Sequence, residues 1–305
     1  TEIPDEFPLL TLSKKFDEKL ISSSIKKWKP FDFTNSNIDK FLDSLNIDKT
    51  VGISSIEGGY KNASNRFDSF LSEGFSNYAQ FSSDPSKNAS SQMSPYFHFG
   101  HISTHEVFEK LVKHESWSPE QIKPNLVGRR EGWWGGSLNF DSFLDELITW
   151  RELGYHTCVR RANYNQYSSL PEWAVKTLQE HANDEREHVY SLDQLTYSET
   201  HDEIWNAAQN QLREQGIIQN YLRMLWGKKI LEWSPNPQIA LSYMITLNDR
   251  YALDGRDPNS YSGVFWVLGR YDRAWGPERD IYGKIRYMTS DSAARKFNLK
   301  PYLEE

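Results

Sequence analysis

The sequence is poor in the residues that build disulfide frameworks, cysteine-based metal clusters or membrane spans. Cys158 is the single cysteine among 305 residues, which excludes an intramolecular disulfide and a cysteine zinc cluster. No apolar run approaches the roughly 20 residues that cross a bilayer, and the first ten residues lack the basic and apolar regions of a secretory signal. We therefore expect an intracellular protein without membrane association, in a compartment that the sequence leaves open.

The chain is acidic as a whole but basic in one region. It carries 35 Lys and Arg against 42 Asp and Glu, a net charge of −7, whereas residues 223–300 hold 13 basic and 8 acidic residues. An acidic total argues against a protein that coats nucleic acid, but the local excess leaves room for a basic face. Aromatic residues make up 14% of the chain and include 11 Trp. Because an indole needs burial and a partner for its N–H, this density predicts a thick core, a stacking surface, or both.

Alternation with a period of two, which marks half-buried strands, is nearly absent. We divide the chain into a weakly patterned segment, residues 1–55, and a helical domain, residues 56–305. The first segment has short helices expected over residues 13–28 and 38–47. In the second domain, helices are expected over residues 62–81, 103–112, 140–153, 171–182, 201–216, 220–233 and 237–255. Ser103 or Thr104 is the expected N-cap of the second of these, and Gly216 ends the fifth. The sequence thus predicts an all-α protein.

Clustered hydroxyls precede a predicted helix start at Pro95. Ser90, Ser91 and Ser94, together with free backbone N–H groups, suit a phosphate. A solvated loop with a helix cap explains the same residues, and the hydroxyls alone favour that simpler interpretation.

Three histidines follow within one short stretch: His98, His101 and His105. Two of them are spaced to share a helical face, as metal ligands do. No Glu follows His101 as the zinc-protease pattern requires, and no third ligand is evident. Packing or capping roles are therefore favoured, and no metal site is expected.

Two helical segments carry spacings of interest. Glu146 and Trp150 stand at i and i+4, which predicts one helix face. A carboxyl group beside an indole suits a general acid or a hydrogen-bond acceptor near a stacked base, but a core Trp beside solvated charges fits equally. Trp226 and Trp233 are seven residues apart, with Trp205 on the preceding helix. Aligned indoles relay electrons or simply pack, and spacing alone favours packing.

Residues 247–288 are the most unusual stretch. Three aromatic residues, Trp266, Tyr271 and Trp275, interleave there with Arg and Lys side chains, among them Arg273 and Arg286. Aromatic rings supply stacking faces and guanidinium groups supply phosphate contacts. The pattern favours nucleic-acid binding, with a cofactor-binding loop as the alternative.

Taken together, SPYFHFGHIS, ELITWREL, YLRMLWGKKILEW and LNDRYALDGRDPNSYSG with DRAWGPER resemble motifs of the photolyase/cryptochrome family. The likeness is greatest to the C-terminal flavin domain of class II cyclobutane pyrimidine dimer photolyases, and it runs from about Gly58 to Tyr302. It implies an all-helical domain that holds a U-shaped FAD, active in its reduced anionic form. It also implies an enzyme that splits pyrimidine dimers in UV-damaged DNA with light, acting as a monomer.

By this resemblance, the cofactor would contact residues from four parts of the chain. The phosphate and ribityl side would be lined by Tyr78, Ser90, Ser91, Gln92, Met93 and Ser94, and Phe143 and Arg151 would also touch the cofactor. Arg223 and Asp254 are similar to the ion pair beside the isoalloxazine ring. Asn248 resembles the residue that faces the reactive flavin nitrogen, with Arg256, Asp257 and Ser260 in the same loop.

The resemblance also assigns a lesion side and an electron route. Glu146 is similar to the carboxyl group that hydrogen-bonds the dimer, and the expected pocket and strand contacts are Trp150, Met224, Trp266, Arg273 and Trp275. The expected tryptophan relay, which would reduce oxidised flavin in light, runs from Trp226 through Trp205 to Trp233, with Trp233 nearer solvent.

Some features depart from the family pattern or leave alternatives open. Residues 1–55 show no βαβ pattern, so we interpret them as a linker remnant and expect neither the N-terminal α/β antenna domain nor an antenna pigment. Ser260 stands where class II enzymes commonly have Gly. A cryptochrome-like photoreceptor without repair activity is the main alternative, and a helical nucleic-acid-binding domain without flavin is a third. Repair of (6-4) lesions is less favoured, since no His is evident at the pocket motifs.

Overall fold

A computed structural model describes residues 38–87, 89–129 and 131–304, and the chain divides into two compact units, Thr1–Thr50 and Val51–Glu305. The helix expected over residues 13–28 lies outside the described residues. In the first unit, α1 (Ile38–Ser44) forms where a helix is predicted, and none of its residues is buried. The described part of the chain contains no β-strand, only an isolated bridge between Arg279 and Gly283. The prediction of an all-α fold is confirmed.

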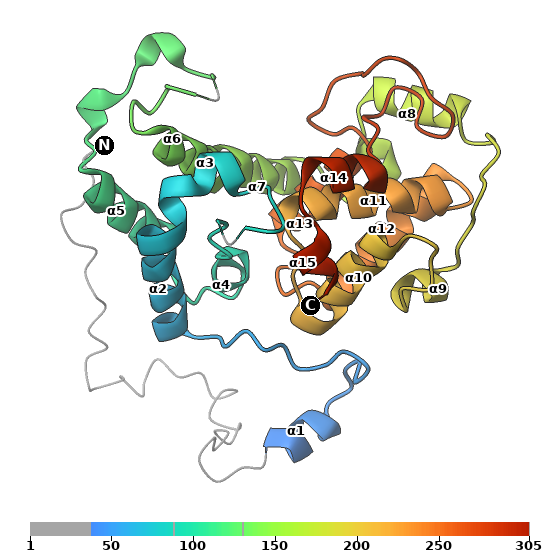
Figure 1. Cartoon of the computed structure of the whole chain (residues 1–305), viewed down its shortest axis with the longest axis horizontal. Coiled ribbons are helices and arrows are strands. Elements are labelled where there is room, and N and C mark those ends of the chain that lie inside the picture. Colours follow the sequence, from blue (N-terminus) through green and yellow to red (C-terminus); the bar gives the residue numbers. More distant parts are fainter. Residues whose placement is uncertain (1–37, 88, 130, 305) are drawn as a thin grey trace. The chain divides into compact units, whose positions relative to one another are not determined.

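The second unit is built from helices joined by irregular segments (Figure 1). In chain order the longer ones are α2 (Tyr60–Ser69), α5 (Thr104–Glu115), α6 (Leu138–Leu144), α7 (Arg151–Arg160), α8 (Glu172–Glu180), α10 (Glu203–Gln215), α11 (Asn220–Trp233), α12 (Pro237–Tyr251), α13 (Pro258–Val267) and α14 (Ser290–Lys296). The short ones are α3 (Tyr78–Phe81), α4 (Ser94–His98), α9 (Leu192–Thr196) and α15 (Lys300–Leu303), with 3-10 turns at Phe75–Asn77, Pro119–Gln121, Pro124–Leu126 and Tyr167–Ser169.

Helix ends follow local sequence signals. Ser103 accepts a hydrogen bond from the N–H of Glu106 at 3.0 Å and so caps α5, and Gly216 adopts a left-handed φ of 75° at the end of α10. Both predicted ends are confirmed, because a hydroxyl satisfies a free helix N–H and glycine takes positive φ without strain. Pro171 stands one residue before the first helical residue of α8.

Two predicted helices are interrupted by π-helical turns. The helix expected over residues 62–81 becomes π-helical at η3 (Phe70–Gly74), and that expected over 140–153 does so at η7 (Asp145–Trp150). A π turn inserts one residue into the helical repeat and re-aims the side chains beyond it. The second interruption carries Glu146 and Trp150, so their relation is not the α-helical one that the spacing predicts.

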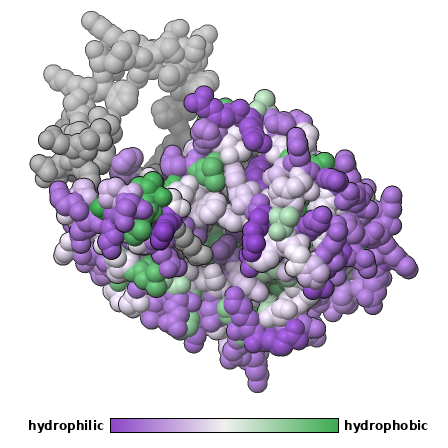
Figure 2. Space-filling model, turned by 90° about the horizontal axis from the view of Figure 1, so that it is seen from above, coloured by the Kyte–Doolittle hydropathy of each residue, from purple (hydrophilic) through white to green (hydrophobic). Residues whose placement is uncertain are grey.

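The hydrophobic interior of the second unit is divided into two clusters. The first core takes its buried residues from the range 63–147 and the second core from the range 170–302. In Figure 1 the helices α2, α4 and α5 lie on the left and α8 to α14 on the right. The cavities described below are lined by residues from both ranges. On the face seen in Figure 2, hydrophilic residues dominate and hydrophobic residues gather only in small patches.

Close contact between α11 and α13 depends on a glycine, which gives a test of the second core. A Cβ at Gly227 would lie 2.5 Å from Cγ2 of Val267 and 3.1 Å from Sδ of Met244. We expect Gly227→Ala to lower the free energy of unfolding by about 1–3 kcal/mol through overpacking, measured by urea denaturation. The matched control is Gly263→Ala on α13, where no atom lies within 4 Å of the added Cβ. Because alanine favours helix, the control should be neutral or stabilising; equal losses in both variants would contradict the packing argument.

Candidate functional site

Two adjoining cavities open between the residues of the first and second cores. Their volumes are about 610 Å³ and 640 Å³, within the range of small-molecule sites. Residues from α3, the segment before α4 and the α6–η7 region line one side, and residues from α11 line the other. The two cavities adjoin and are together called the cleft, and seven residues line both: Tyr78, Ser83, Ser91, Met93, Ser94, Glu146 and Asn220.

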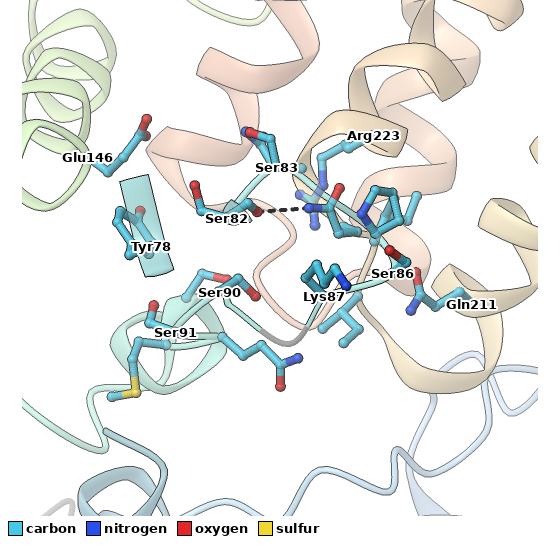
Figure 3. A pocket seen from close by; sticks show the side chains of 18 of the residues that line it. Tyr78, Ser82, Ser83, Ser86, Lys87, Ser90, Ser91, Glu146, Gln211 and Arg223 are labelled. Atoms are coloured by element: carbon cyan, nitrogen blue, oxygen red, sulfur yellow. Dashed lines mark hydrogen bonds between the residues drawn. The ribbon is translucent and has the colours of Figure 1, made fainter. Parts of the chain in front are cut away.

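The first cavity is rich in hydroxyl groups. All six residues expected on the phosphate and ribityl side of a cofactor line it, and so do Ser82, Ser83, Ser86 and Lys87. Figure 3 shows Tyr78 and Glu146 on one side of this cavity and Arg223 and Gln211 on the other. Such a set of hydroxyl and ammonium donors suits a phosphate-containing ligand.

Two side chains hold the wall of the first cavity in place. The guanidinium of Arg66 donates to the carbonyl oxygens of Ser91 and Ser90 at 3.0 and 3.1 Å. From the opposite side, Nε2 of Gln219 donates to the carbonyl oxygen of Ser82 at 2.8 Å (Figure 3). The segment between residues 82 and 91 is therefore fixed at both ends by long-range hydrogen bonds.

The expected pair of Arg223 and Asp254 is present, with Nη1 and Oδ1 3.5 Å apart. Arg223 also lines the first cavity. The pair is largely shielded, since the two side chains are 23% and 16% exposed. Its position beside a flavin ring stays a prediction.

The residues expected together in one loop near Asn248 are distributed differently. Asn248 is buried within α12 and its Nδ2 donates to Oγ of Ser260, which is buried within α13. Asp257 caps α13, accepting from the N–H of Asn259 at 2.9 Å, and Arg256 is exposed in the turn with φ 66°. Asn248 lies in the helix expected over residues 237–255, whereas the loop expected to hold Ser260 was wrong, because α13 begins at Pro258. None of these four predicted residues lines either cavity, and their cofactor contact stays a prediction.

The second cavity has aromatic walls. The rings of Trp150 and Trp266 lie 4.5 Å apart at 52°, and the indole N–H of Trp150 donates to Oδ2 of Asp145 at 2.9 Å. Glu146, in η7, lines both cavities. Thus Glu146 and Trp150 do reach the same cavity, although through a π turn. Ten residues predicted from the sequence line this cavity: Tyr78, Ser91, Met93, Ser94, Phe143, Glu146, Trp150, Arg151, Met224 and Trp266.

The predicted strand contacts lie outside that lining. The guanidinium of Arg273 sits 4.5 Å and that of Arg286 5.0 Å from the ring centroid of Trp275, so Trp275 carries two stacked cations. Of these residues only Arg286 lines the second cavity. Lys296 also lines it, with its ammonium 4.6 Å from the ring centroid of Tyr221.

Sequence reasoning missed several residues of the cleft. Ser83, Ser86 and Lys87 belong to a Ser-rich segment that could have indicated them. Arg286 was named in the aromatic and basic stretch, but not as a residue that lines a cavity. Other lining residues carry no local signal, because they come from parts of the chain that only the fold brings together: Gln211, Gln215, Gln219, Asn220 and Lys296.

The three expected relay tryptophans are in contact. The indole N–H of Trp205 donates to the carbonyl oxygen of Trp226 at 3.0 Å, and the rings of Trp205 and Trp233 lie 5.6 Å apart at 71°. The indole N–H of Trp226 donates to Oε1 of Gln209 at 2.8 Å. Trp233 was expected nearer solvent, but it is 2% exposed, as is Trp226. The exposed fraction does not distinguish the two indoles, and the order of the relay toward solvent stays a prediction; the rings of Tyr190 and His201 pack against Trp233.

His98 and His101 make polar contacts, and the described residues contain neither a metal-binding cluster nor a helix that could span a membrane. Nδ1 of His101 accepts from the N–H of Gly59 at 3.1 Å, and Nδ1 of His98 lies 3.4 Å from Oδ2 of Asp257. In residues 38–87, 89–129 and 131–304, no group of three His, Cys, Asp or Glu side chains is placed to hold a metal ion. No helix within these ranges has the length and apolar character of a transmembrane segment.

Several curated proteins are similar to this chain in sequence. The chain matches no protein-family model. It is 41% identical over 247 residues to a deoxyribodipyrimidine photo-lyase of Methanothermobacter thermautotrophicus, covering 81% of this chain and 50% of the relative. Proteins of the same name from Oryza sativa subsp. japonica and Potorous tridactylus are 40% and 37% identical, with 77% and 85% of this chain and 43% and 45% of the relatives covered. The chain spans about half the length of the curated relatives it matches.

Solved structures share its fold. A bacterial class III photolyase from Agrobacterium tumefaciens aligns with a TM-score of 0.56 at 19% identity, over 80% of this chain and 44% of that one. A cryptochrome from Synechocystis sp. PCC6803 aligns with a TM-score of 0.60 at 13% identity, over 86% and 47%. At these identities the likeness concerns the fold alone.

Proposed function

The chain is related by sequence and fold to the photolyase/cryptochrome family, and on that premise we propose that it is the flavin-binding, catalytic part of a light-driven DNA repair enzyme. Its substrate would be a cyclobutane pyrimidine dimer in UV-damaged DNA, as the resemblance of its motifs to those of class II photolyases suggests. The observation that carries the proposal is the cleft, in which a hydroxyl-rich cavity adjoins an aromatic one and Glu146 lines both.

The residues of the cleft fit FAD in chemistry and size. The first cavity, about 610 Å³ in volume, offers the hydroxyls of Ser90, Ser91 and Ser94 and the ammonium of Lys87 to a pyrophosphate. Arg223, neutralised in part by Asp254, would lie near the ring system and favour its reduced, anionic form. When bound and excited by blue or near-UV light, reduced FAD supplies the electron that opens the dimer.

The second cavity supplies the groups that would receive a flipped-out dimer. A dimer pairs and stacks poorly, so extruding it costs less than extruding intact bases. The indoles of Trp150 and Trp266 offer apolar faces to it. A carboxyl group that donates its O–H to a pyrimidine carbonyl stabilises negative charge on that oxygen, and this is the role we assign to Glu146. Arg286 and Lys296 would bind the phosphates of the strand.

A cryptochrome-like photoreceptor is the second candidate, supported by the structural likeness to the Synechocystis cryptochrome. The tryptophan relay would serve either function. The combination of Glu146, Trp150 and Trp266 in one cavity favours repair, because a light sensor has no need of a pocket for damaged bases.

The test is a lamp-on and lamp-off comparison. The purified chain, loaded with FAD, is mixed with an oligonucleotide that holds one thymine dimer, and dimer loss is measured. We expect a yellow protein and dimer loss only in light. A folded protein that binds flavin but never repairs would support the photoreceptor, and one that stays colourless after reconstitution would contradict both candidates.

A further inference from the structure

His181 lies between two carboxylate groups that come from different parts of the chain. Its Nδ1 is 2.5 Å from Oδ2 of Asp184 and its Nε2 is 3.2 Å from Oε1 of Glu278. His181 and Asp184 directly follow α8, whereas Glu278 belongs to the loop of residues 271–287 between α13 and α14. The imidazole therefore joins α8 to this loop.

Backbone contacts hold the same loop against the same segment. Oδ2 of Asp184 also accepts from the N–H of Ile281 at 2.8 Å, and Oγ1 of Thr177 accepts from the N–H of Lys284 at 3.0 Å. The approach at Gly283 is so close that a Cβ there would lie 2.1 Å from Oγ1 of Thr177. Residues 177–184 thus form a clasp on one side of the loop.

The loop carries cations suited to a nucleic-acid strand. Arg273 and Arg286 stack on the ring of Trp275, and the N–H of Trp275 donates to the carbonyl oxygen of Lys284 at 2.9 Å. Because Arg286 lines the second cavity, the position of this cationic group relative to the cavity depends on how the loop is held.

The clasp is complete, with the His181 ring donating to both Asp184 and Glu278, only when His181 is an imidazolium. A neutral imidazole has one N–H and can donate to one of the two carboxylates, whereas the imidazolium donates to both. The hydrogen bond to Asp184 raises the pKa of His181 above its ordinary 6.5, burial acts in the opposite direction, and the hydrogen bond to Glu278 raises it further. The other charged group nearby, Arg186, acts on Asp184.

We propose that His181 is a positioning residue for nucleic-acid binding, which ties Glu278 to Asp184 and so holds Arg273 and Arg286 in place for the strand. The binding part of this inference rests on the proposed function. Since the folded-state pKa lies above the ordinary value, the clasp is complete below about pH 6.5 and is lost as the pH rises through the raised pKa.

Two separate measurements test the proposal: hydrogen exchange reports on the order of the loop, and binding affinity reports on its contact with nucleic acid. Hydrogen exchange of residues 271–287, corrected for the intrinsic pH dependence of exchange, is measured between about pH 6 and about pH 9. The affinity for a duplex with one thymine dimer is measured over the same range at constant salt. We expect protection and affinity each to fall by about fivefold with rising pH, the ratio that a partly exposed charged pair supplies.

Two variants distinguish this role from simple packing. His181→Gln should show weak protection that no longer changes with pH. Glu278→Gln should keep its protection at high pH, because the new amide donates to Nε2 of a neutral imidazole whose Nδ1–H still binds Asp184. His188→Gln is the matched control, because His188 has its ion-pair contact with Glu187 and not with the loop, and it should behave as the wild type.

Two results would overturn the proposal: wild-type protection that does not vary with pH, or an undiminished pH dependence in His181→Gln. If wild-type protein binds the damaged duplex at no pH, the proposed function fails, and the exchange data still decide the role of His181.

Discussion

Replacing Trp226 with phenylalanine is expected to slow the photoreduction of bound, oxidised flavin by at least about tenfold, which corresponds to about 1.4 kcal/mol of added barrier. The carbonyl oxygen of Trp226 accepts a hydrogen bond from the indole N–H of Trp205, and the ring of Trp205 packs against the ring of Trp233. Phenyl rings are harder to oxidise than indoles, so the substitution breaks the only route we assign. Photoreduction is followed by the loss of the flavin absorbance bands under blue light with an external reductant.

The same variant should repair dimers normally once its flavin is reduced chemically. Repair uses the cleft residues, and Trp226 lines neither cavity. The substitution leaves Oε1 of Gln209 without its indole donor, which costs about 1–3 kcal/mol of stability, so folding is checked first. Trp117→Phe is the matched control, since this buried indole of the first core also loses one hydrogen bond, to the carbonyl oxygen of Trp134, but lies outside the relay. If folded Trp226→Phe reduced its flavin in light at the wild-type rate, the proposed tryptophan relay would be contradicted.

The sequence predicted most of the longer helices because their signals are local, but it did not predict α13 or α14. Periodic apolar residues, the Ser103 hydroxyl and the left-handed Gly216 act within one or two turns. The π turns at Phe70–Gly74 and Asp145–Trp150 could not be predicted in this way. A π turn leaves the apolar spacing nearly unchanged, and packing of the chain around it decides where the extra residue is inserted.

The residues of the candidate site show the same contrast between local signals, which can be predicted, and contacts that only the fold creates. Trp150 was found because it belongs to a contiguous motif that resembles a family, and Ser90, Ser91 and Trp266 were found because they lie close to such motifs. Gln219 could not be found, because a lone polar residue before a helix carries no signal of a contact with a segment more than a hundred residues away. The motif also misled: it placed Ser260 in a loop, whereas capping by Asp257 begins α13 before that residue.

Replacing Glu146 with alanine is expected to lower the yield of dimer repair per absorbed photon while leaving FAD bound. Glu146 is exposed and lines both cavities, so a change at this position acts on the cleft with little effect on the core. Alanine has high helix propensity, and an exposed site leaves no cavity, so stability should change by less than about 0.5 kcal/mol.

The size of the effect follows from where Glu146 lies. Removing one donor from a buried anion-stabilising site costs about 100- to 1,000-fold in rate. Water reaches an exposed carboxyl group and replaces part of its contribution, so we expect a loss nearer to tenfold. Glu146→Gln should retain more activity than Glu146→Ala, because its amide still donates to a carbonyl oxygen. Repair is measured on a thymine-dimer oligonucleotide with chemically reduced protein, and bound FAD by absorbance after denaturation. Glu109→Gln on α5, whose carboxylate pairs with Lys113 on the helix surface, is the matched control. An unchanged yield in Glu146→Ala would show that the carboxyl group takes no part in dimer splitting, and a loss of FAD would assign it to cofactor binding instead.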